Sequence, residues 1–418
     1  MLEINFIRDN QELVKKAAKN KQLNPKVVDE VLRYDDQRRK LIQEVEEIRA
    51  KRNELNEELK NERSDELISK SIELKKQLQE IEPQLKKVEE AFNDLMLQVP
   101  NVPAIDVPIG KDETGNKVVR IEGKKPKFSF EPKEHFELAE ALDLYDSKRA
   151  VRIAGNRAYF LKNELVELEQ AVLAYALDLI TKEGFTPMTV PWMVNREALV
   201  GTGYFPWGEA DHYKTQDGQG LIGTAEVALT AYYMNEILSH KDLPVKLCGI
   251  SPCFRREVGS YGKDTKGFFR IHQFNKVEMV VMSVADEDDS RKWHEKMLGI
   301  SETLLHDLGL SYQVLLMCTG DMGAGQRRKY DIETWFPGQG KYRETHSDSY
   351  FLDFQSRRLN TRYKDKDGKT KYVYTLNNTV AATPRLLAAI LENYQQKDGS
   401  VKVPQVLQKY VGFKVIKR

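Results

Sequence analysis

Residues 254–281 read FRREVGSYGKDTKGFFRIHQFNKVEMVV, two strand-like segments around a basic, glycine-rich loop. Two strands joined in this way would place Arg255 and Arg270 side by side, and arginines held on rigid strands suit bidentate binding of phosphates. Phe274 is suited to stack on a base. Glu278 lies in an apolar run, where a carboxylate is costly to bury unless it binds something polar. The stretch therefore predicts a phosphate-binding site on paired strands, and a surface hairpin with ion pairs is the alternative.

The sequence around this stretch alternates helical and strand-like segments. No insert of helix length separates 311–317 from 331–336, so these strands are expected to pair antiparallel. We predict an α+β fold in which helices surround an antiparallel sheet. The expected helices are 134–147, 163–183, 223–239, 286–308 and 384–396. The expected strands are 185–190, 245–249, 277–284, 311–317, 331–336, 349–355 and 371–376.

The first 100 residues differ in character, because the first glycine of the chain is Gly110. Seam positions recur every three or four residues from Leu41 to Leu59, if Arg52 fills one of them, and from Leu67 to Leu95. We predict an antiparallel coiled-coil hairpin over about 27–98, roughly 50 Å long at 1.5 Å per residue. The Pro- and Gly-rich connection 99–126 marks the boundary between domains 1–103 and 104–418.

Inside the hairpin, residues 61–65 suit a chain reversal, with Ser64 or Asp65 as the N-cap of the second helix. Pro83 is expected to kink that helix. Residues 26–98 hold 15 Lys and Arg against 19 Asp and Glu, which is typical of a solvated hairpin. The alternative is a grip on nucleic acid through a local basic cluster: Arg33, Arg38, Arg39, Lys40, Arg49, Lys51 and Arg52.

Composition excludes several classes of protein. The 418 residues carry a net charge of +1, and ordinary apolar content argues against general disorder. The longest strictly apolar run, 171–177, is too short to cross a membrane, and the first ten residues do not resemble a secretory signal. Cys248, Cys253 and Cys318 form no disulfide framework or paired metal motif, which favours a reducing cytoplasm. Phosphate-loop, dinucleotide-binding and His-Glu-x-x-His motifs are absent from the sequence.

Three separated motifs resemble the signatures of class II aminoacyl-tRNA synthetases, in the right order. FRRE, a loop and RIHQF are similar to the second signature. Pro191 is similar to the proline of the first signature, which lies at the dimer interface in that class. Arg385, in LNNTVAATPR, resembles the arginine of the third.

Within that class the whole chain resembles the bacterial-type seryl-tRNA synthetases. The N-terminal coiled coil and four further segments carry this resemblance. These segments are Thr224-Ala225-Glu226, RETHS at 343–347, DFQSRR at 353–358 and ENYQ at 392–395. The resemblance implies a ligase that attaches serine to tRNA(Ser), with ATP as a substrate and seryl-adenylate as the intermediate.

Roles for individual residues follow only from this resemblance. Arg255 would hold the α-phosphate and the serine carboxylate, and Arg270 and Arg385 would meet the triphosphate. Glu257 would fix the adenine amino group, with Phe274 stacked on the ring. The implied ATP-binding set also contains Arg256, Glu344, Thr345, His346 and Ser347, of which Glu344 and Ser347 would hold Mg²⁺. The implied serine-binding set is Thr224, Ala225, Glu226, Glu278, Asn377 and Thr379.

The chemistry is compatible with these roles. Attack of a carboxylate on the α-phosphate brings two anions together, so the site must supply positive charge rather than a general base. A polar pocket that bonds the serine hydroxyl can reject alanine by about 10⁴–10⁵-fold. The implied partners are a second copy of the chain and tRNA(Ser), held by the coiled-coil arm and the 259–267 loop.

Two departures from the family pattern lie near the expected substrate positions. The family often has glycine where this chain has Asn378, and we expect the asparagine to tolerate a left-handed turn there. The segment after Glu344 usually runs Ile-Ser-Ser-Cys, whereas here it is Thr345-His346-Ser347-Asp348. Two other functions stay open: a synthetase-like ligase that charges a carrier protein, and a non-catalytic tRNA-binding protein. The first tends to lack the long arm, and the second usually loses signature arginines.

Overall fold

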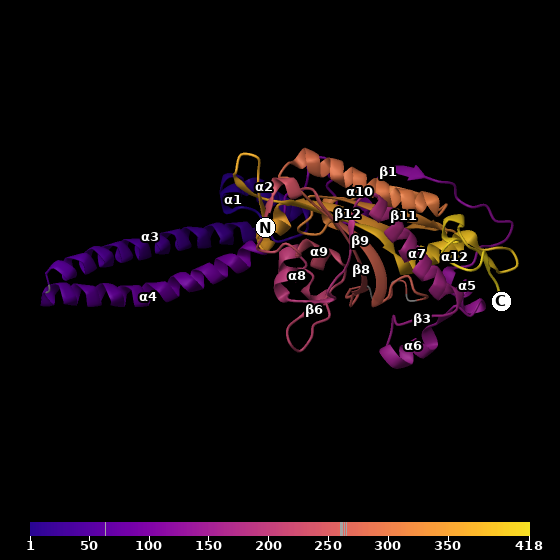
Figure 1. The fold of residues 1–418 in the computed structure, drawn as a ribbon, viewed down its shortest axis with the longest axis horizontal. Helices are drawn as coiled ribbons and strands as arrows, with labels where there is room; N and C mark the ends of the chain where they lie inside the picture. Colours follow the sequence, from indigo (N-terminus) through magenta and orange to yellow (C-terminus); the bar gives the residue numbers. More distant parts are fainter. Residues whose placement is uncertain (63, 260–261, 263, 265) are drawn as a thin grey trace. The chain divides into compact units, whose positions relative to one another are not determined.

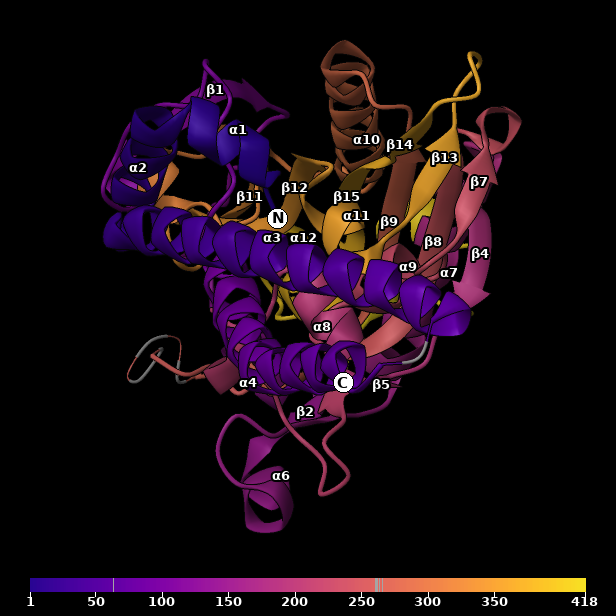
Figure 2. The same ribbon diagram turned by 90° about the vertical axis from the view of Figure 1, so that its left-hand side faces the viewer.

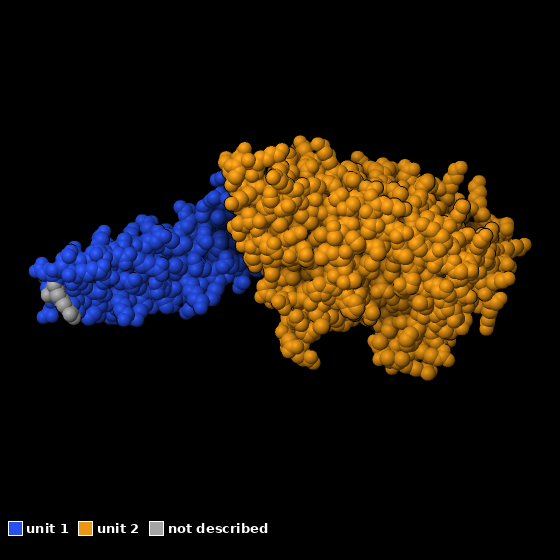
Figure 3. All heavy atoms as spheres, viewed as in Figure 1, with its two compact units in different colours: residues 1–102 blue, residues 103–418 orange. Residues whose placement is uncertain are grey.

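The computed structural model describes the chain except residues 63, 260–261, 263 and 265. It contains two compact units, residues 1–102 and 103–418, which Figure 3 colours separately. In the described part of the chain, no helix is both long and apolar enough to cross a membrane.

The first unit is built on a long helical hairpin. Two short helices, α1 (Ile4–Asp9) and α2 (Gln11–Asn20), precede α3 (Lys26–Asn61) and α4 (Asp65–Met96). The two long helices run side by side (Figure 1). This confirms the predicted helical arm. Ser64 is the N-cap of α4, because the Ser64 side chain accepts a hydrogen bond from the Leu67 amide at 3.3 Å.

The predicted seam faces inward in both helices. Val45, Leu55, Leu78 and Phe92 are buried among exposed polar neighbours, as a 4-3 repeat requires. Helix α4 continues through Pro83.

The second unit is built on an eight-stranded sheet with the order β1-β10-β11-β12-β15-β9-β8-β4. Figure 2 shows strands of this sheet side by side. Neighbours pair antiparallel except β4 and β8, which are parallel. The α+β prediction is therefore confirmed. The strands are β1 (Lys117–Glu122), β4 (Thr186–Thr189), β8 (Val245–Phe254), β9 (Gln273–Ser283), β10 (Tyr312–Leu316), β11 (Arg328–Phe336), β12 (Lys341–Leu352) and β15 (Tyr374–Ala382).

Helices cover both faces of this sheet. Because successive strand residues point to opposite faces, Val277, Met279 and Val281 of β9 enter the main core, whereas Val280 enters a second cluster. The main core is completed by α7 (Glu164–Lys182), α10 (Glu287–Asp307) and α12 (Thr383–Tyr394). The second cluster contains α8 (Arg196–Thr202) and α9 (Glu226–Thr230). The face covered by α7, α10 and α12 thus forms the main core, whereas the face covered by α9 carries the candidate site.

Smaller elements complete the second unit. They are α5 (His135–Ala141), β2 (Tyr145–Asp146), α6 (Ser147–Ala154), β3 (Phe160–Leu161), β5 (Met193–Val194), β6 (Gly220–Leu221), β7 (Ile237–Ser239), α11 (Phe354–Leu359), β13 (Arg362–Lys364), β14 (Thr370–Tyr372), β16 (Val401–Lys402) and β17 (Val415–Ile416).

Several predicted boundaries are wrong. The helix predicted over 223–239 is only α9, followed later by β7, and Asn235 at φ 67° has the left-handed backbone that a helix cannot continue through. The predicted strand 349–355 ends at Leu352, and α11 follows it. The predicted connection 99–126 contains the edge strand β1, whose mostly exposed side chains give no alternating pattern.

Candidate active site

A pocket on the α9 side of the sheet brings together most of the residues that the sequence singled out. Glu278 and Val280 lie on the same face of β9, two residues apart, and Val280 packs in the cluster that contains α9. Fourteen of the sixteen predicted site residues line this pocket: Thr224, Glu226, Arg255, Glu257, Arg270, Phe274, Glu278, Glu344, Thr345, His346, Ser347, Asn377, Thr379 and Arg385. Ala225 and Arg256 do not line it.

Ala225 and Arg256 contact parts of the second unit outside this pocket. Ala225 is buried in the apolar cluster around α9. Arg256 is exposed, and its Nη1 donates to the Ala210 carbonyl at 2.9 Å. A role for either residue stays a prediction.

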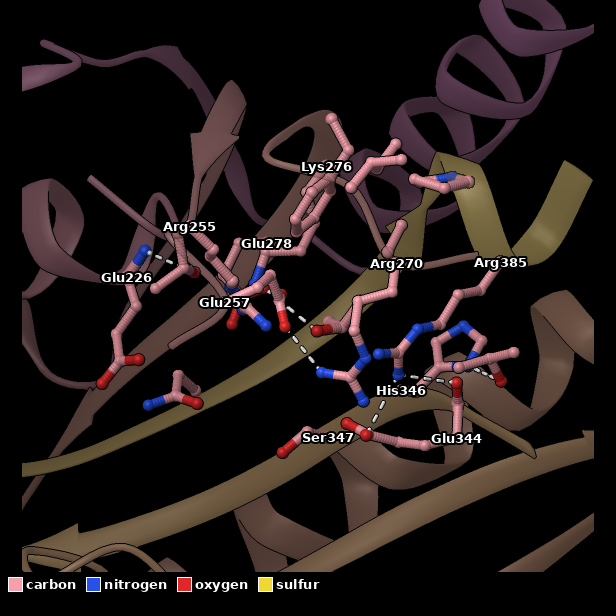
Figure 4. A pocket seen from close by; sticks show the side chains of 18 of the residues that line it. Glu226, Arg255, Glu257, Arg270, Lys276, Glu278, Glu344, His346, Ser347 and Arg385 are labelled. Atoms are coloured by element: carbon pink, nitrogen blue, oxygen red, sulfur yellow. Dashed lines mark hydrogen bonds and ion pairs between the residues drawn. The ribbon is translucent and has the colours of Figure 1, made fainter. Parts of the chain in front are cut away.

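Figure 4 shows the labelled side chains spread along the pocket. Glu226 lies towards one end, and Arg385 and Glu344 lie towards the other. Three arginines reach the pocket from different elements, since Arg255 follows β8, Arg270 precedes β9 and Arg385 lies in the first turn of α12.

The arginines are held by specific contacts. Arg270 Nη1 donates to Glu257 Oε2 at 2.6 Å, and Arg385 Nη1 donates to Glu344 Oε2 at 3.0 Å. Arg255 Nε lies 3.3 Å from the Gly223 carbonyl, and its guanidinium lies 5.3 Å from the centre of the Phe274 ring. Cations and an aromatic ring therefore line the same pocket, as a nucleotide site requires.

A β-bulge decides where the predicted metal ligands point. In the pairing of β11 with β12, Glu333 faces Glu344 and Ile332 faces His346, so Thr345 is an extra residue. Residues three apart would otherwise lie on opposite faces of a strand. The bulge turns Glu344 and Ser347 into the same pocket.

The residues at this position suit a magnesium ion. Burial opposes ionisation of Glu344, but the charges of Arg385 and Lys329 outweigh it and hold the pKa of Glu344 well below its usual value. Asp331 pairs across the strands with Ser347, and its buried Oδ1 has no hydrogen-bond partner among the described residues. The described residues contain no cluster of three His, Cys, Asp or Glu for a metal. Mg²⁺ usually takes one or two carboxylates plus substrate phosphates, so this donor set fits it.

Two buried carboxylates at the other end differ in their charge balance. Glu278 Oε2 lies 2.5 Å from Lys276 Nζ, and the Thr379 hydroxyl donates to the same oxygen at 3.2 Å. Glu226 instead accepts hydrogen bonds from two neutral groups, the Tyr204 hydroxyl at 2.7 Å and the Gln355 amide at 2.9 Å. Burial raises the pKa of Glu226 to about 7, the charge of Glu278 adds to the rise, and its two hydrogen bonds oppose it.

Comparison with known proteins agrees with this geometry. Residues 1–103 match the family model of the seryl-tRNA synthetase N-terminal domain, and residues 212–394 match the tRNA synthetase class II core domain (G, H, P, S and T). The serine--tRNA ligase of Deinococcus radiodurans is 45% identical over 99% of this chain and 98% of its own length. That of Treponema denticola is 40% identical over 99% of both chains.

Solved structures give the same result. The seryl-tRNA synthetase of Pyrococcus horikoshii complexed with ATP matches with a TM-score of 0.93 and 42% identity, over 100% of this chain and 99% of that one. The chain belongs to the seryl-tRNA synthetase family. The cytoplasmic serine-tRNA ligase of Naegleria fowleri in complex with AMP matches with a TM-score of 0.88 and 31% identity, over 100% and 99% of the two chains.

Of the residues that depart from the family pattern, Thr345 and His346 line the pocket, whereas Asn378 and Asp348 lie behind it. Asn378 is in the middle of β15 and its φ is not positive, so the expected left-handed turn is wrong. Its Nδ2 donates to the Met297 carbonyl and to Ser301 Oγ of α10, at 2.9 and 3.0 Å. Asp348 pairs with Asn378 across the strands, and its Oδ2 lies 3.6 Å from His294 Nε2 of the same helix. Both residues face α10 and do not line the pocket.

Three polar residues that were not predicted also line the pocket: Tyr204, Lys276 and Gln326. Lys276 was detectable, because it lies two residues before Glu278 on the same face of a strand. Tyr204 follows α8, outside the sequence segments that carry the other pocket residues, so no local pattern indicated it.

Proposed function

We propose that this protein catalyses the ATP-dependent attachment of serine to tRNA(Ser), through seryl-adenylate. The supporting observation is the arrangement of the pocket in a member of this family. Arg270 and Arg385 lie towards one end, and Arg255 lies towards the other, beside the two carboxylates Glu226 and Glu278. This matches a triphosphate nucleotide beside a small zwitterion.

In the first step a carboxylate oxygen of serine attacks the α-phosphate, and the bond to pyrophosphate breaks. Arg255 would bring the two anions together, and Arg270 and Arg385 would hold the departing phosphates, so the rate gain comes from positioning and charge. Glu257 would meet the adenine amino group, with Phe274 on the ring. Ionised Glu344, with Ser347, would hold Mg²⁺, which supplies further positive charge to the phosphates when bound. Thr345 and His346 would complete the ATP site.

Charge balance suggests which carboxylate meets which group of serine. Glu278 is already neutralised by Lys276, so it would accept a hydrogen bond from the neutral serine hydroxyl, together with Thr379. Glu226 has only neutral donors among the described residues, so it would meet the ammonium group. Thr224, Ala225 and Asn377 would complete the serine site.

The experiment is ATP–pyrophosphate exchange. We expect exchange that depends on serine and on Mg²⁺ and is at least about 10⁴-fold weaker with alanine. Equal exchange with both amino acids would contradict the proposal. Arg255→Ala should abolish exchange while the thermal unfolding midpoint stays near that of the wild type. Near-normal exchange would remove Arg255 from the site.

The helical arm would bind tRNA(Ser), with residues 1–103 as a tRNA-binding domain and 104–418 as the aminoacylation domain. Part of the predicted basic cluster is used internally, since Arg38 pairs with Asp35 at 3.1 Å and stacks on Phe92. Lys40, Arg49 and Lys51 are exposed; Arg49 also pairs with Glu82 of α4 at 2.8 Å, but this surface ion pair is weak enough for a phosphate to replace it.

The test replaces Lys40, Arg49 and Lys51 together by glutamine. Serine-dependent exchange should persist while tRNA charging falls and loses part of its salt dependence. The matched control places glutamines at exposed Lys75, Lys76 and Lys86 of α4. Unchanged charging by the first variant would contradict the role of the cluster. The 259–267 loop would approach the acceptor stem, although residues 260, 261, 263 and 265 lie outside the described part.

A homodimer is proposed from the exposed apolar side chains beside Pro191. Trp192 and Met193 are 51% and 54% exposed, although both are large and apolar. Trp192→Asp should shift the sedimentation coefficient towards that of a monomer.

A cytoplasmic location is also proposed, since all three cysteines are buried and unpaired, as in a reducing compartment.

A further inference from the structure

The hydrogen bonds around Glu226 come from residues to which the proposed chemistry assigns no role. Gln355 belongs to the DFQSRR segment on α11, Tyr204 follows α8, and Thr375 is the second residue of β15. All three converge on one carboxylate of the pocket, either directly or through a partner.

The direction of each hydrogen bond can be assigned. Gln355 Nε2 lies 2.9 Å from the Thr202 carbonyl and 2.9 Å from Glu226 Oε1. A carbonyl can only accept, so the side-chain atom that faces it must be the amide nitrogen. Gln355 Oε1 then faces Thr375 Oγ1 at 2.6 Å, and that hydroxyl must donate.

The second oxygen of Glu226 has its own donor. The Tyr204 hydroxyl lies 2.7 Å from Glu226 Oε2, and burial, with the charge of Glu226, raises the pKa of Tyr204 well above its ordinary value. Tyr204 therefore stays a neutral donor. Each oxygen of a carboxylate can accept two hydrogen bonds, so one site on each remains for a ligand.

We propose that Tyr204 and Gln355 are positioning residues that hold both oxygens of Glu226 in the orientation needed to receive the ammonium group of the amino acid. The inference rests on the proposed function, because that function makes Glu226 the partner of the ammonium. Two neutral donors orient the carboxylate without cancelling its charge, whereas a lysine or arginine there would compete with the ligand.

The charged and titratable groups around Glu226 come from several elements. Glu278 and Lys276 lie on β9, Arg255 follows β8, and Tyr204 follows α8. Glu278 is paired with Lys276, so the loss of the Tyr204 hydroxyl would act mainly on Glu226 itself. Removal of a donor to a carboxylate raises its pKa and disfavours the ionised form.

Tyr204→Phe is the decisive variant, because it removes one hydroxyl and keeps the ring. We expect the KM for serine in ATP–pyrophosphate exchange to rise about 10-fold to 100-fold, since a hydrogen bond to a charged group is lost. The KM for ATP should stay within about twofold, because Glu226 lies away from Arg385 and Glu344. The increase in KM for serine should be larger at the acidic end of the neutral range, because fewer molecules then have ionised Glu226.

Tyr175→Phe is the matched control. Its hydroxyl donates to the Asp307 carboxylate outside the pocket, so its loss should leave the KM for serine and its pH dependence unchanged. Gln355→Met is the second variant, and if it fails to fold, Tyr204→Phe alone decides the matter.

The outcomes separate the two proposals. If the wild type shows no serine-dependent exchange, the proposed function fails. If the wild type is active and Tyr204→Phe has an unchanged KM for serine, or one raised equally at every pH, the positioning role is overturned and the function stands.

Discussion

Replacement of Lys276 by methionine should destabilise the second unit by about 3–5 kcal/mol. Lys276 Nζ lies 2.5 Å from Glu278 Oε2, and the two side chains are only 6% and 3% exposed. At that distance the attraction is about 7 kcal/mol for an effective dielectric constant of about 20. Much of it offsets the cost of removing both ions from water. Methionine keeps the apolar stem but leaves Glu278 buried without an opposite charge, which is the costly state.

Urea unfolding followed by tryptophan fluorescence measures this loss of unfolding free energy. The four tryptophans, Trp192, Trp207, Trp293 and Trp335, all lie in the second unit, so the signal reports that unit alone. Protein concentration is kept constant, because any dimer would make the midpoint depend on it. The double variant Lys276→Met/Glu278→Gln should recover most of the stability but not serine-dependent exchange, because it removes both charges together.

Lys214→Met is the matched control. Lys214 Nζ lies 2.6 Å from Glu209 Oε1, but the two side chains are 48% and 30% exposed, so its loss should cost less than about 1 kcal/mol. The reasoning is refuted if Lys276→Met costs no more than Lys214→Met, or if the double variant is no more stable than Lys276→Met.

Three further predictions concern other parts of the chain. The KM for serine should rise as the pH falls through about 7 because Glu226, whose pKa is raised to about 7, becomes protonated and neutral; a flat profile from pH 8 to 6 would contradict this. Removal of Mg²⁺ by EDTA should stop exchange, and Glu344→Gln should raise the Mg²⁺ concentration needed for half-maximal exchange; an unchanged Mg²⁺ requirement would exclude Glu344 as a ligand. Ser64→Ala should weaken the start of α4 by about 1 kcal/mol, detected as roughly fivefold faster exchange of the Leu67 and Ile68 amides, and equal rates would show that the cap is unimportant.

Local patterns in the sequence were sufficient for the arm and for most of the sheet. The 4-3 spacing from Leu41 to Leu95 predicts the paired helices, because the period of the apolar residues sets which face must be buried. Ser64 as a cap was equally local, since an N-cap contacts an amide only three residues ahead. Local patterns failed over 223–239, where an apolar run that suggested one helix is divided by the left-handed residue Asn235.

Arg255, Glu257, Arg270 and Glu278 were singled out from the sequence, because charged residues inside strand-like runs are costly unless they serve a ligand, whereas Arg385 was identified only through the family resemblance. Only the tertiary structure decided which side chains share the pocket. The bulge at Thr345 turns Glu344 and Ser347 to one face, and the register of β12 with β15 turns Asp348 and Asn378 to the other. Tyr204 and Gln355 meet Glu226 from segments up to 129 positions away, and no periodicity records such a contact. Sequence patterns report the local preference of the backbone, whereas pocket membership depends on strand register and on packing between distant segments.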